Sequence, residues 1–258
     1  MSRFTGRVVL VTGSAERAGA QIALAFAAHG ATVYLNHHGQ ADAAASTLAL
    51  AAEAGVGDRV HALECDITDP AATAAMVDEI VARSGRLDLL IHNASTFAPR
   101  PFLELEQRDF DSSIGVNLRG PFFLSQAAAR VMVAQGGGRI LAILGNSLSE
   151  VWPDFAPHII AKTGLGRLME QLAVTLSPTV QCNSIAPTQF FRSDDGANDA
   201  LRLLRGETPV SAGTTKVKGI TVRETSIDDV IDVLMFLADA PASVTGATLP
   251  IDGGRVLI

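Results

Sequence analysis

The chain has 258 residues, 48% of them hydrophobic and 18% charged, which is enough to bury the core of one large α/β domain. A net charge of −7 argues against a protein that binds nucleic acid or an anionic membrane over a general surface. Only Cys65 and Cys182 are present, which argues against a disulfide framework or a cysteine-based metal site. The N-terminus lacks the apolar core of a signal peptide, and no apolar run approaches a membrane span, so we expect a cytoplasmic protein without a metal.

Short apolar runs alternate along the chain with longer segments of helical periodicity. Continuous apolar runs of this length are typical of strands buried on both faces of a parallel sheet. The expected strands are residues 8–12, 32–36, 60–64, 87–92, 140–144 and 180–185. The alternation predicts a single domain over residues 1–258, an α/β fold with a doubly wound parallel sheet of Rossmann type and helices on both faces.

The segments between the strands carry helix start and stop signals. Asp69 is a suitable N-cap, Pro70 suits a first turn, and Gly30 and Gly55 are suitable ends. The expected helices are residues 18–29, 41–54 and 71–83, followed by helices within 109–135, 157–177 and 226–238.

Residues 188–225 interrupt this alternation. The segment is rich in Gly, Thr and charge, and it predicts a long mobile loop with a short helix near residues 199–205. Ligands of open α/β sheets bind beyond the carboxyl ends of the strands. We therefore expect residues 188–225 to form a substrate lid.

A glycine-containing turn, TGSAERAG, connects the first strand to the first helix. Gly13 permits a tight turn, Gly19 allows close approach of the backbone, and the helix N-terminus attracts a pyrophosphate. The strict G-x-G-x-x-G spacing is absent, and such a turn also occurs for purely geometric reasons. Arg17 favours a nucleotide because a guanidinium binds phosphate well.

The end of the second strand reads Asn36, His37, His38, Gly39, Gln40. Sites that prefer NAD commonly carry an acidic residue here, which binds the ribose and repels a 2′-phosphate. No carboxylate follows this strand directly, so the sequence favours NADPH over NADH.

Several stretches together resemble the short-chain dehydrogenase/reductase family, over nearly the whole chain from residue 6 to residue 254. Besides the glycine turn they are CDI at 65–67, HNAS at 92–95, VNLRG around Asn117, HIIAK at 158–162, CNSIAPT at 182–188 and VTGATLPIDGG at 244–254. The resemblance implies an NADP(H) cofactor along the strand ends and a homo-tetramer built through helices within 109–135 and 157–177. The cofactor-binding residues that it implies are Gly13, Arg17, Gly19, Asn36, His37, His38, Asp66, Ile67, Asn93, Ala94, Ser95, Lys162, Pro187 and Thr188, with Asp66 and Ile67 beside the adenine and Asn93 and Ala94 beside the nicotinamide ribose.

Within the family, the arginine-containing loop and the NASTF stretch look most like the pteridine reductases. By that resemblance Ser95 lies near the cofactor phosphates, and Phe97 faces the nicotinamide across a flat substrate. Stacking would hold such a ring in a fixed orientation. The alternative is that Phe97 packs beneath the lid.

The HIIAK segment occupies the place of the family's Tyr-x-x-x-Lys motif, so His158 stands where a tyrosine is expected. Counting back thirteen residues, Gly145 stands where the family has a serine, and Ser147 or Asn146 is a candidate substitute. Of the four catalytic positions of the family pattern, Lys162 and Asn117 keep the expected residue. The resemblance implies that Lys162 binds the nicotinamide ribose and that Asn117 holds a water in the proton relay.

An imidazole differs from a phenol in what it does near neutral pH. Its pKa starts near 6.5 and a neighbouring ammonium lowers it, so His158 is expected to be mainly neutral. A neutral imidazole suits alcohol oxidation or proton abstraction better than acid-assisted reduction.

The preferred function is therefore an NADP(H)-dependent oxidoreductase acting on a small carbonyl, alcohol or pteridine-like ring, with His158, Lys162, Asn117 and Ser147 as catalytic residues. A regulatory or partner subunit that binds NADP(H), with His158 as a space-filler, and a lyase or isomerase with His158 as base remain alternatives.

Overall fold

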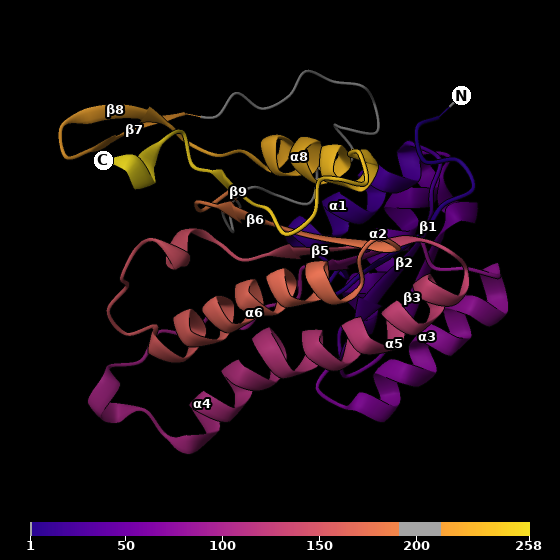
Figure 1. The fold of residues 1–258 in the computed structure, drawn as a ribbon, viewed down its shortest axis with the longest axis horizontal. Coiled ribbons are helices and arrows are strands. Elements are labelled where there is room, and N and C mark those ends of the chain that lie inside the picture. The colour runs from indigo at the N-terminus through magenta and orange to yellow at the C-terminus, as the bar shows by residue number, and fades with distance from the viewer. Residues whose placement is uncertain (1, 191–212) are drawn as a thin grey trace.

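A computed structural model describes residues 2–190 and 213–258 of the protein. Its centre is a seven-stranded parallel sheet in the order β3-β2-β1-β4-β5-β6-β9 (Figure 1). The strands are β1 (Val8–Val11), β2 (Thr32–His37), β3 (Val60–Glu64), β4 (Leu89–His92), β5 (Gly138–Ile143), β6 (Val180–Pro187) and β9 (Thr248–Ile251). The predicted doubly wound α/β fold is confirmed, and the six predicted strands are all present.

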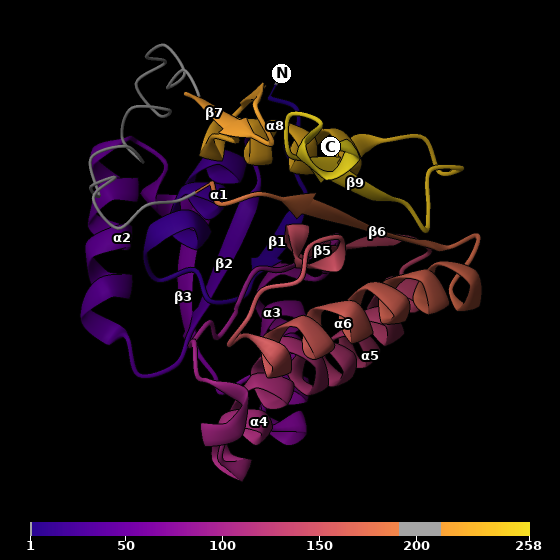
Figure 2. The same cartoon turned by 90° about the vertical axis from the view of Figure 1, so that its left-hand side faces the viewer.

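Helices cover both faces of the sheet, as the two views in Figures 1 and 2 show. One face packs against α1 (Arg17–Ala28), α2 (Ala41–Glu53) and α8 (Ile227–Asp239). The other packs against α3 (Pro70–Ser84), α5 (Gly120–Ala134) and α6 (Ala156–Thr175). Strand residues that alternate in sequence, such as Val9 and Leu10, supply the two separate cores.

The ends of α3 follow the predicted signals. The Asp69 side chain accepts hydrogen bonds from the backbone N–H groups of Ala71 and Ala72, Pro70 opens the first turn, and Gly85 ends the helix with a positive φ. At the start of α1, by contrast, Glu16 provides no side-chain cap. The N-terminus of α1 is therefore available to an anion.

Residues 107–134 form α4 (Gln107–Ile114), a π-helical turn (Gly115–Arg119) and α5 without a break. The sequence predicts helix here but gives no sign of the π turn. Such turns recur at functional sites because the extra residue re-aims one side chain. Here the turn contains Asn117, whose side chain is fully buried.

The described part of the predicted lid contains a β-hairpin where the sequence analysis expected a loop. β7 (Thr214–Val217) and β8 (Ile220–Arg223) pair antiparallel, and the hairpin projects from the body in Figure 1. Lys218 and Gly219, the two residues between them, both have positive φ, which is the geometry that a two-residue hairpin turn requires. The predicted helix at 199–205 lies outside the described residues.

No helix within residues 2–190 and 213–258 is both long and apolar enough to cross a membrane. The same residues contain no group of three His, Cys, Asp or Glu side chains able to hold a metal ion.

Candidate active site

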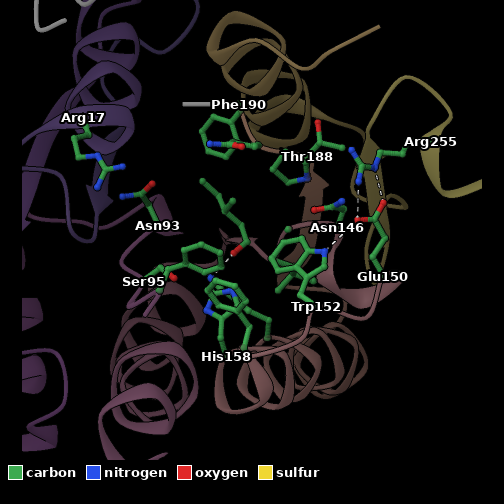
Figure 3. A pocket seen from close by; sticks show the side chains of 18 residues that line it. Arg17, Asn93, Ser95, Asn146, Glu150, Trp152, His158, Thr188, Phe190 and Arg255 are labelled. Atoms are coloured by element: carbon green, nitrogen blue, oxygen red, sulfur yellow. Dashed lines mark hydrogen bonds and ion pairs between the residues drawn. The ribbon is translucent and has the colours of Figure 1, made fainter. Parts of the chain in front are cut away.

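Two adjoining pockets lie at the carboxyl ends of the strands. The first, the glycine-turn pocket, has a volume of about 460 Å³. The second, the His158 pocket, has a volume of about 530 Å³ (Figure 3). Arg17, Asn93, Ser95 and Phe190 line both pockets, so the two form one continuous site.

The glycine-turn pocket is built around closely packed backbone. A Cβ on Gly13 would come within 2.8 Å of Ala94 Cα, and a Cβ on Gly19 would overlap the Gly13 carbonyl oxygen. The Asn93 side chain braces the turn, because its Nδ2 donates to the carbonyl oxygens of Thr12 and Gly13, each at 2.9 Å. Together with the uncapped start of α1, this turn has the shape and the free donors that a pyrophosphate requires.

At the end of β2, Asn36 holds the pocket together from within. Its side chain is only 2% exposed; Oδ1 accepts from the Gly13 N–H, and Nδ2 donates to the Cys65 carbonyl oxygen at 2.9 Å. His37 is buried, whereas His38 is exposed and its Nδ1 lies 3.9 Å from an Asp66 carboxylate oxygen. All four predicted nucleotide residues at these strand ends (Asn36, His37, His38 and Asp66) line the glycine-turn pocket, as do Ile67 and Ala94.

One carboxylate in this pocket, that of Glu16, was not predicted from the sequence. Glu16 lines it next to Arg17, and its Oε1 accepts a hydrogen bond from Gln40 Nε2 at 3.2 Å. Glu16 precedes α1, and the prediction considered only the residues that follow β2. A carboxylate here would repel a 2′-phosphate and attract ribose hydroxyl groups, so it acts against the preference that Arg17 favours.

The π turn holds Asn117 behind the site: this predicted catalytic residue lines neither pocket, but it contacts Ser95, which lines both. Asn117 Oδ1 accepts from Ser95 Oγ at 2.7 Å, and its Nδ2 donates to the carbonyl oxygens of Ser113 at 3.0 Å and Thr96 at 3.1 Å. Asn117 thereby fixes both the Ser95 hydroxyl and the Thr96 backbone. The same Thr96 carbonyl oxygen is the partner of His158.

His158 lies on the first turns of α6 with only 8% of its surface exposed, and its ring lines the His158 pocket. Its Nδ1 lies 3.0 Å from the Thr96 carbonyl oxygen. A carbonyl oxygen only accepts, so Nδ1 carries the proton and Nε2 keeps a lone pair. Nε2 has no hydrogen-bond partner among the described residues, which leaves it for a ligand. Burial lowers the pKa of His158, the hydrogen bond to Thr96 opposes this, and the Lys162 charge lowers it further.

Lys162 lies one turn after His158 and is only 4% exposed. Its Nζ donates to the Ile143 carbonyl oxygen at 2.8 Å, at the end of β5. Burial lowers the pKa of Lys162 to about 8. Lys162 lines the His158 pocket. Burial, with a smaller contribution from the Lys162 charge, lowers the pKa of His92 on β4 to about 3 and keeps that imidazole neutral.

The loop after β5 departs from the family's sequence pattern, and its backbone is unusual at Gly145. Gly145 has φ +91° and ψ 163°, a combination that residues with a side chain rarely adopt. Asn146 lines the His158 pocket, but Ser147 does not; its Oγ is buried without a hydrogen-bond partner among the described residues. Of the two predicted substitutes for the missing serine, the structure brings only Asn146 to the pocket.

Phe97 stands in an aromatic cluster that forms one wall of the His158 pocket. Its ring stacks on Phe155, with centroids 4.2 Å apart, and meets the edges of Trp152 and His158. It is 56% exposed, so it belongs to the pocket surface more than to the core. Phe155 and Trp152 have no motif, and no sequence signal pointed to them.

An ion pair that was not predicted from the sequence lines the far end of the His158 pocket. Arg255 Nε donates to Glu150 Oε1 at 2.5 Å, and Arg255 Nη2 and Trp152 Nε1 donate to Glu150 Oε2 (Figure 3). The two charged residues are 105 positions apart, so no local pattern connects them.

Pro187 is the last residue of β6, and Thr188 follows it. Both line the His158 pocket, and Thr188 Oγ1 lies 2.6 Å from Thr225 Oγ1, which donates to the Ile251 carbonyl oxygen of β9. The hydroxyl of Thr188 therefore donates to Thr225, and the contact fixes the beginning of the predicted lid to the sheet.

The similarity of this chain to known proteins covers the residues of both pockets. The profile of a family described as enoyl-(acyl carrier protein) reductase matches residues 13–255. A D-threitol dehydrogenase of Mycolicibacterium smegmatis is 33% identical over 99% of this chain and 95% of its own length. An L-rhamnose 1-dehydrogenase (NAD(P)(+)) of Sphingomonas sp. is 30% identical over 98% of each chain. A gluconate 5-dehydrogenase from Burkholderia cenocepacia, solved in complex with NADP and tartrate, has a TM-score of 0.81 and 29% identity, covering 99% of this chain and 97% of that one.

Proposed function

Because the chain belongs to the short-chain dehydrogenase/reductase family, we propose that it is an NADP(H)-dependent oxidoreductase that oxidises a hydroxyl group of a small alcohol or sugar, with His158 as general base. The hydrogen bond from His158 Nδ1 to the Thr96 carbonyl oxygen carries this proposal. It fixes the tautomer whose free nitrogen, Nε2, accepts a proton.

The direction of the reaction follows from that tautomer. A neutral His158 presents a lone pair to the pocket and has no N–H left to donate to a carbonyl oxygen. Burial and the Lys162 charge lower the pKa of His158, so the protonated form that a reduction would need is scarce at neutral pH. A substrate hydroxyl group is the partner that fits, because it gives its proton to Nε2 as the carbonyl forms.

Lys162 supports the same step as an ammonium. With a pKa of about 8 it is charged at neutral pH, and Nζ donates one of its three hydrogen bonds to Ile143. The remaining donors would hold cofactor ribose hydroxyl groups, as the family resemblance implies. A bound nicotinamide supplies the redox chemistry, and Gly13, Gly19 and Arg17 would hold its phosphates.

NADP(H) is proposed over NAD(H) on the strength of Arg17 and of the neutral end of β2. The names of two similar proteins support a role for NADP in this group: one is an NAD(P)(+) enzyme and another was solved with NADP. Glu16 opposes the preference, so the discrimination is expected to be moderate.

The substrate class rests on similar proteins named for threitol, rhamnose and galactose. The pteridine-like ring that the sequence analysis predicts is a competing class, supported by the exposed Phe97 ring. A panel of polyols, aldoses and reduced pteridines, followed by cofactor absorbance, separates the two classes.

The decisive experiment compares His158→Asn with His158→Ala. The Asn amide nitrogen can replace Nδ1 and keep the bond to Thr96, but neither variant has a base in place of Nε2. We expect both to lose oxidation by roughly 10²–10⁴-fold while binding NADPH normally. Parental turnover in either variant contradicts the proposal. Tight NADPH binding by the parent without oxidation of any panel substrate would instead favour a regulatory subunit, and turnover without a change in cofactor absorbance would favour a lyase or isomerase.

We also propose a homo-tetramer assembled through α4, α5 and α6. These helices expose Phe110, Phe122 and Ile160, which supports an interface along this side of the molecule. Light scattering after size-exclusion chromatography measures the state, and a monomer contradicts the proposal.

A further inference from the structure

The Glu150 and Arg255 pair lies in the His158 pocket away from Arg17 and Asn93, at the opposite side of the close-up in Figure 3. A ligand whose hydroxyl group meets His158 Nε2 can reach this pair within the same pocket. The pair itself is well fixed. Asp252 accepts hydrogen bonds from the backbone N–H groups of Gly254 and Val256, which hold the segment that carries Arg255.

The charge at this end of the pocket is not positive. Glu150 cancels the charge of Arg255. Burial tends to raise the pKa of Glu150, but the hydrogen bonds from Arg255 and Trp152 lower it below its usual value, so Glu150 stays ionised beside the guanidinium. One carboxylate thus neutralises one guanidinium. An anionic substrate would gain no net attraction here, in contrast to a pocket where an arginine stands alone.

The hydrogen-bonding capacity of the pair points to neutral hydroxyl groups. Among the described residues, Arg255 uses two of its five N–H donors on Glu150, and the two carboxylate oxygens accept three hydrogen bonds from Arg255 and Trp152. Three N–H donors of Arg255 and about one acceptor position on the Glu150 carboxylate therefore remain for a ligand. A hydroxyl group both donates and accepts, so neighbouring hydroxyl groups match this mixture, whereas a carboxylate matches only the donors.

The wall between His158 and the pair is apolar. Trp152 and Phe155 pack around the exposed ring of Phe97 and leave aromatic surface in the pocket. Aromatic surface with a few convergent polar groups is the usual composition of a site that orients a small ligand. It can cover the C–H groups of a polyhydroxylated carbon chain while the polar ends are held.

We propose that the Glu150 and Arg255 pair, oriented by Trp152, is the specificity-determining subsite of this enzyme and selects neutral polyhydroxylated substrates over the corresponding acids. This inference rests on the proposed function, because it takes the His158 pocket as the substrate site. Glu150 keeps Arg255 from acting as a carboxylate receptor. Removing the Glu150 charge therefore changes which substrate binds, and does not merely weaken binding.

The test uses three probes with one carbon skeleton: D-glucitol, D-gluconate, and 1-amino-1-deoxy-D-glucitol. Binding to the full-length protein is measured by ligand-observed NMR, which requires no turnover, and thermal melting reports folding. The parent is expected to prefer D-glucitol over D-gluconate. Glu150→Gln keeps the shape of the side chain but releases Arg255, and should shift the ratio of the two affinities about tenfold or more toward D-gluconate. Glu170→Gln, at an exposed ion pair with Arg167 on α6, is the matched control and should leave the ratio unchanged.

Arg255→Lys supplies a second variant, because it keeps the charge but loses the two-pronged contact with Glu150. It should weaken D-glucitol binding with no gain for D-gluconate. An affinity ratio that Glu150→Gln leaves within twofold of the parental ratio overturns the proposal, as does a parent that binds the amine best or binds none of the probes. If the parent binds D-glucitol but oxidises no polyol, the proposed function fails while the subsite stands.

Discussion

The glycine-turn pocket and the His158 pocket lie side by side but are held together in different ways. In the first, side chains such as Asn36 and Asn93 bond to backbone groups at neighbouring strand ends. In the second, charged side chains bond to each other across the fold, since the end wall joins Glu150 to Arg255 near the C-terminus, and the Ser147 hydroxyl on the adjoining loop has no partner among the described residues. We propose that the cofactor-binding site of the family is kept in this chain and that its catalytic site differs. Cofactor binding should therefore survive changes that abolish turnover.

Lys162 is the residue at which we expect one substitution to impair both cofactor binding and turnover. Lys162→Met removes the ammonium that lies in the His158 pocket and is implied in holding the cofactor. We expect turnover to fall by about 10³-fold or more and NADPH affinity to fall as well, since the same buried ammonium is expected to serve both catalysis and cofactor binding. Rapid kinetics and calorimetric titration measure the two effects. Because an unpaired buried charge is costly, the melting temperature should not fall. Unchanged NADPH affinity would show that the two pockets are independent even here.

The pH dependence of oxidation separates the roles of the two titrating groups. His158 must be neutral, so kcat/KM should rise about tenfold per pH unit below an apparent pKa that is itself below 6.5. Lys162 must be charged, so the rate should decline as the pH rises through about 8. A profile from pH 4.5 to 10 measures both limbs. An acid limb centred above pH 6.5 would contradict the assignment of His158, and His158→Asn should lack that limb in any residual rate.

Two charge changes in the glycine-turn pocket should act in opposite directions. Arg17→Ala should lower the preference for NADPH over NADH by around tenfold, because a phosphate contact is lost. Glu16→Gln should raise that preference by a smaller factor, because the carboxylate no longer repels the 2′-phosphate. Both are measured by fluorescence titration with the two cofactors. Turnover at saturating cofactor should hardly change, and equal NADPH and NADH affinities in the parent protein would refute the prediction.

Phe97→Ala should have the smallest effect, confined to the His158 pocket. The ring is more than half exposed, so we expect substrate KM to rise several-fold with little change in melting temperature or cofactor affinity. Steady-state kinetics and thermal melting check this. A loss of stability of about 3 kcal/mol or more would identify a core residue instead.

The difference between the pockets also explains which parts were predictable from the sequence. Strands, helices and the glycine turn depend on local patterns, such as the Asp69 and Pro70 start of α3, and these were predicted with small errors at their boundaries. Arg17 and Asn93 could be placed because family-like motifs flank them. The roles assigned to them stay predictions until ligands are tested.

The end wall of the His158 pocket was not predictable because its contacts are long-range. Glu150 and Arg255 each resemble an ordinary surface charge, and only the fold brings them together. The tautomer of His158 depends on the backbone position of Thr96, 62 residues away, which no spacing rule supplies. Glu16 was overlooked for a different reason: it lies on the loop before α1, whereas the acidic residue of NAD sites is sought after β2.

Gly145 limits how the active site can be re-engineered. A Cβ at this position would meet nothing closer than 3.9 Å, so there is space for a serine, but φ +91° with ψ 163° is unfavourable for one. A serine at position 145 would be strained unless the loop first changed its path. A tyrosine placed at position 158 would therefore lack the serine that the family pattern sets thirteen residues before it. Engineering of reductase activity has to begin with residues 144–148 before it turns to residue 158.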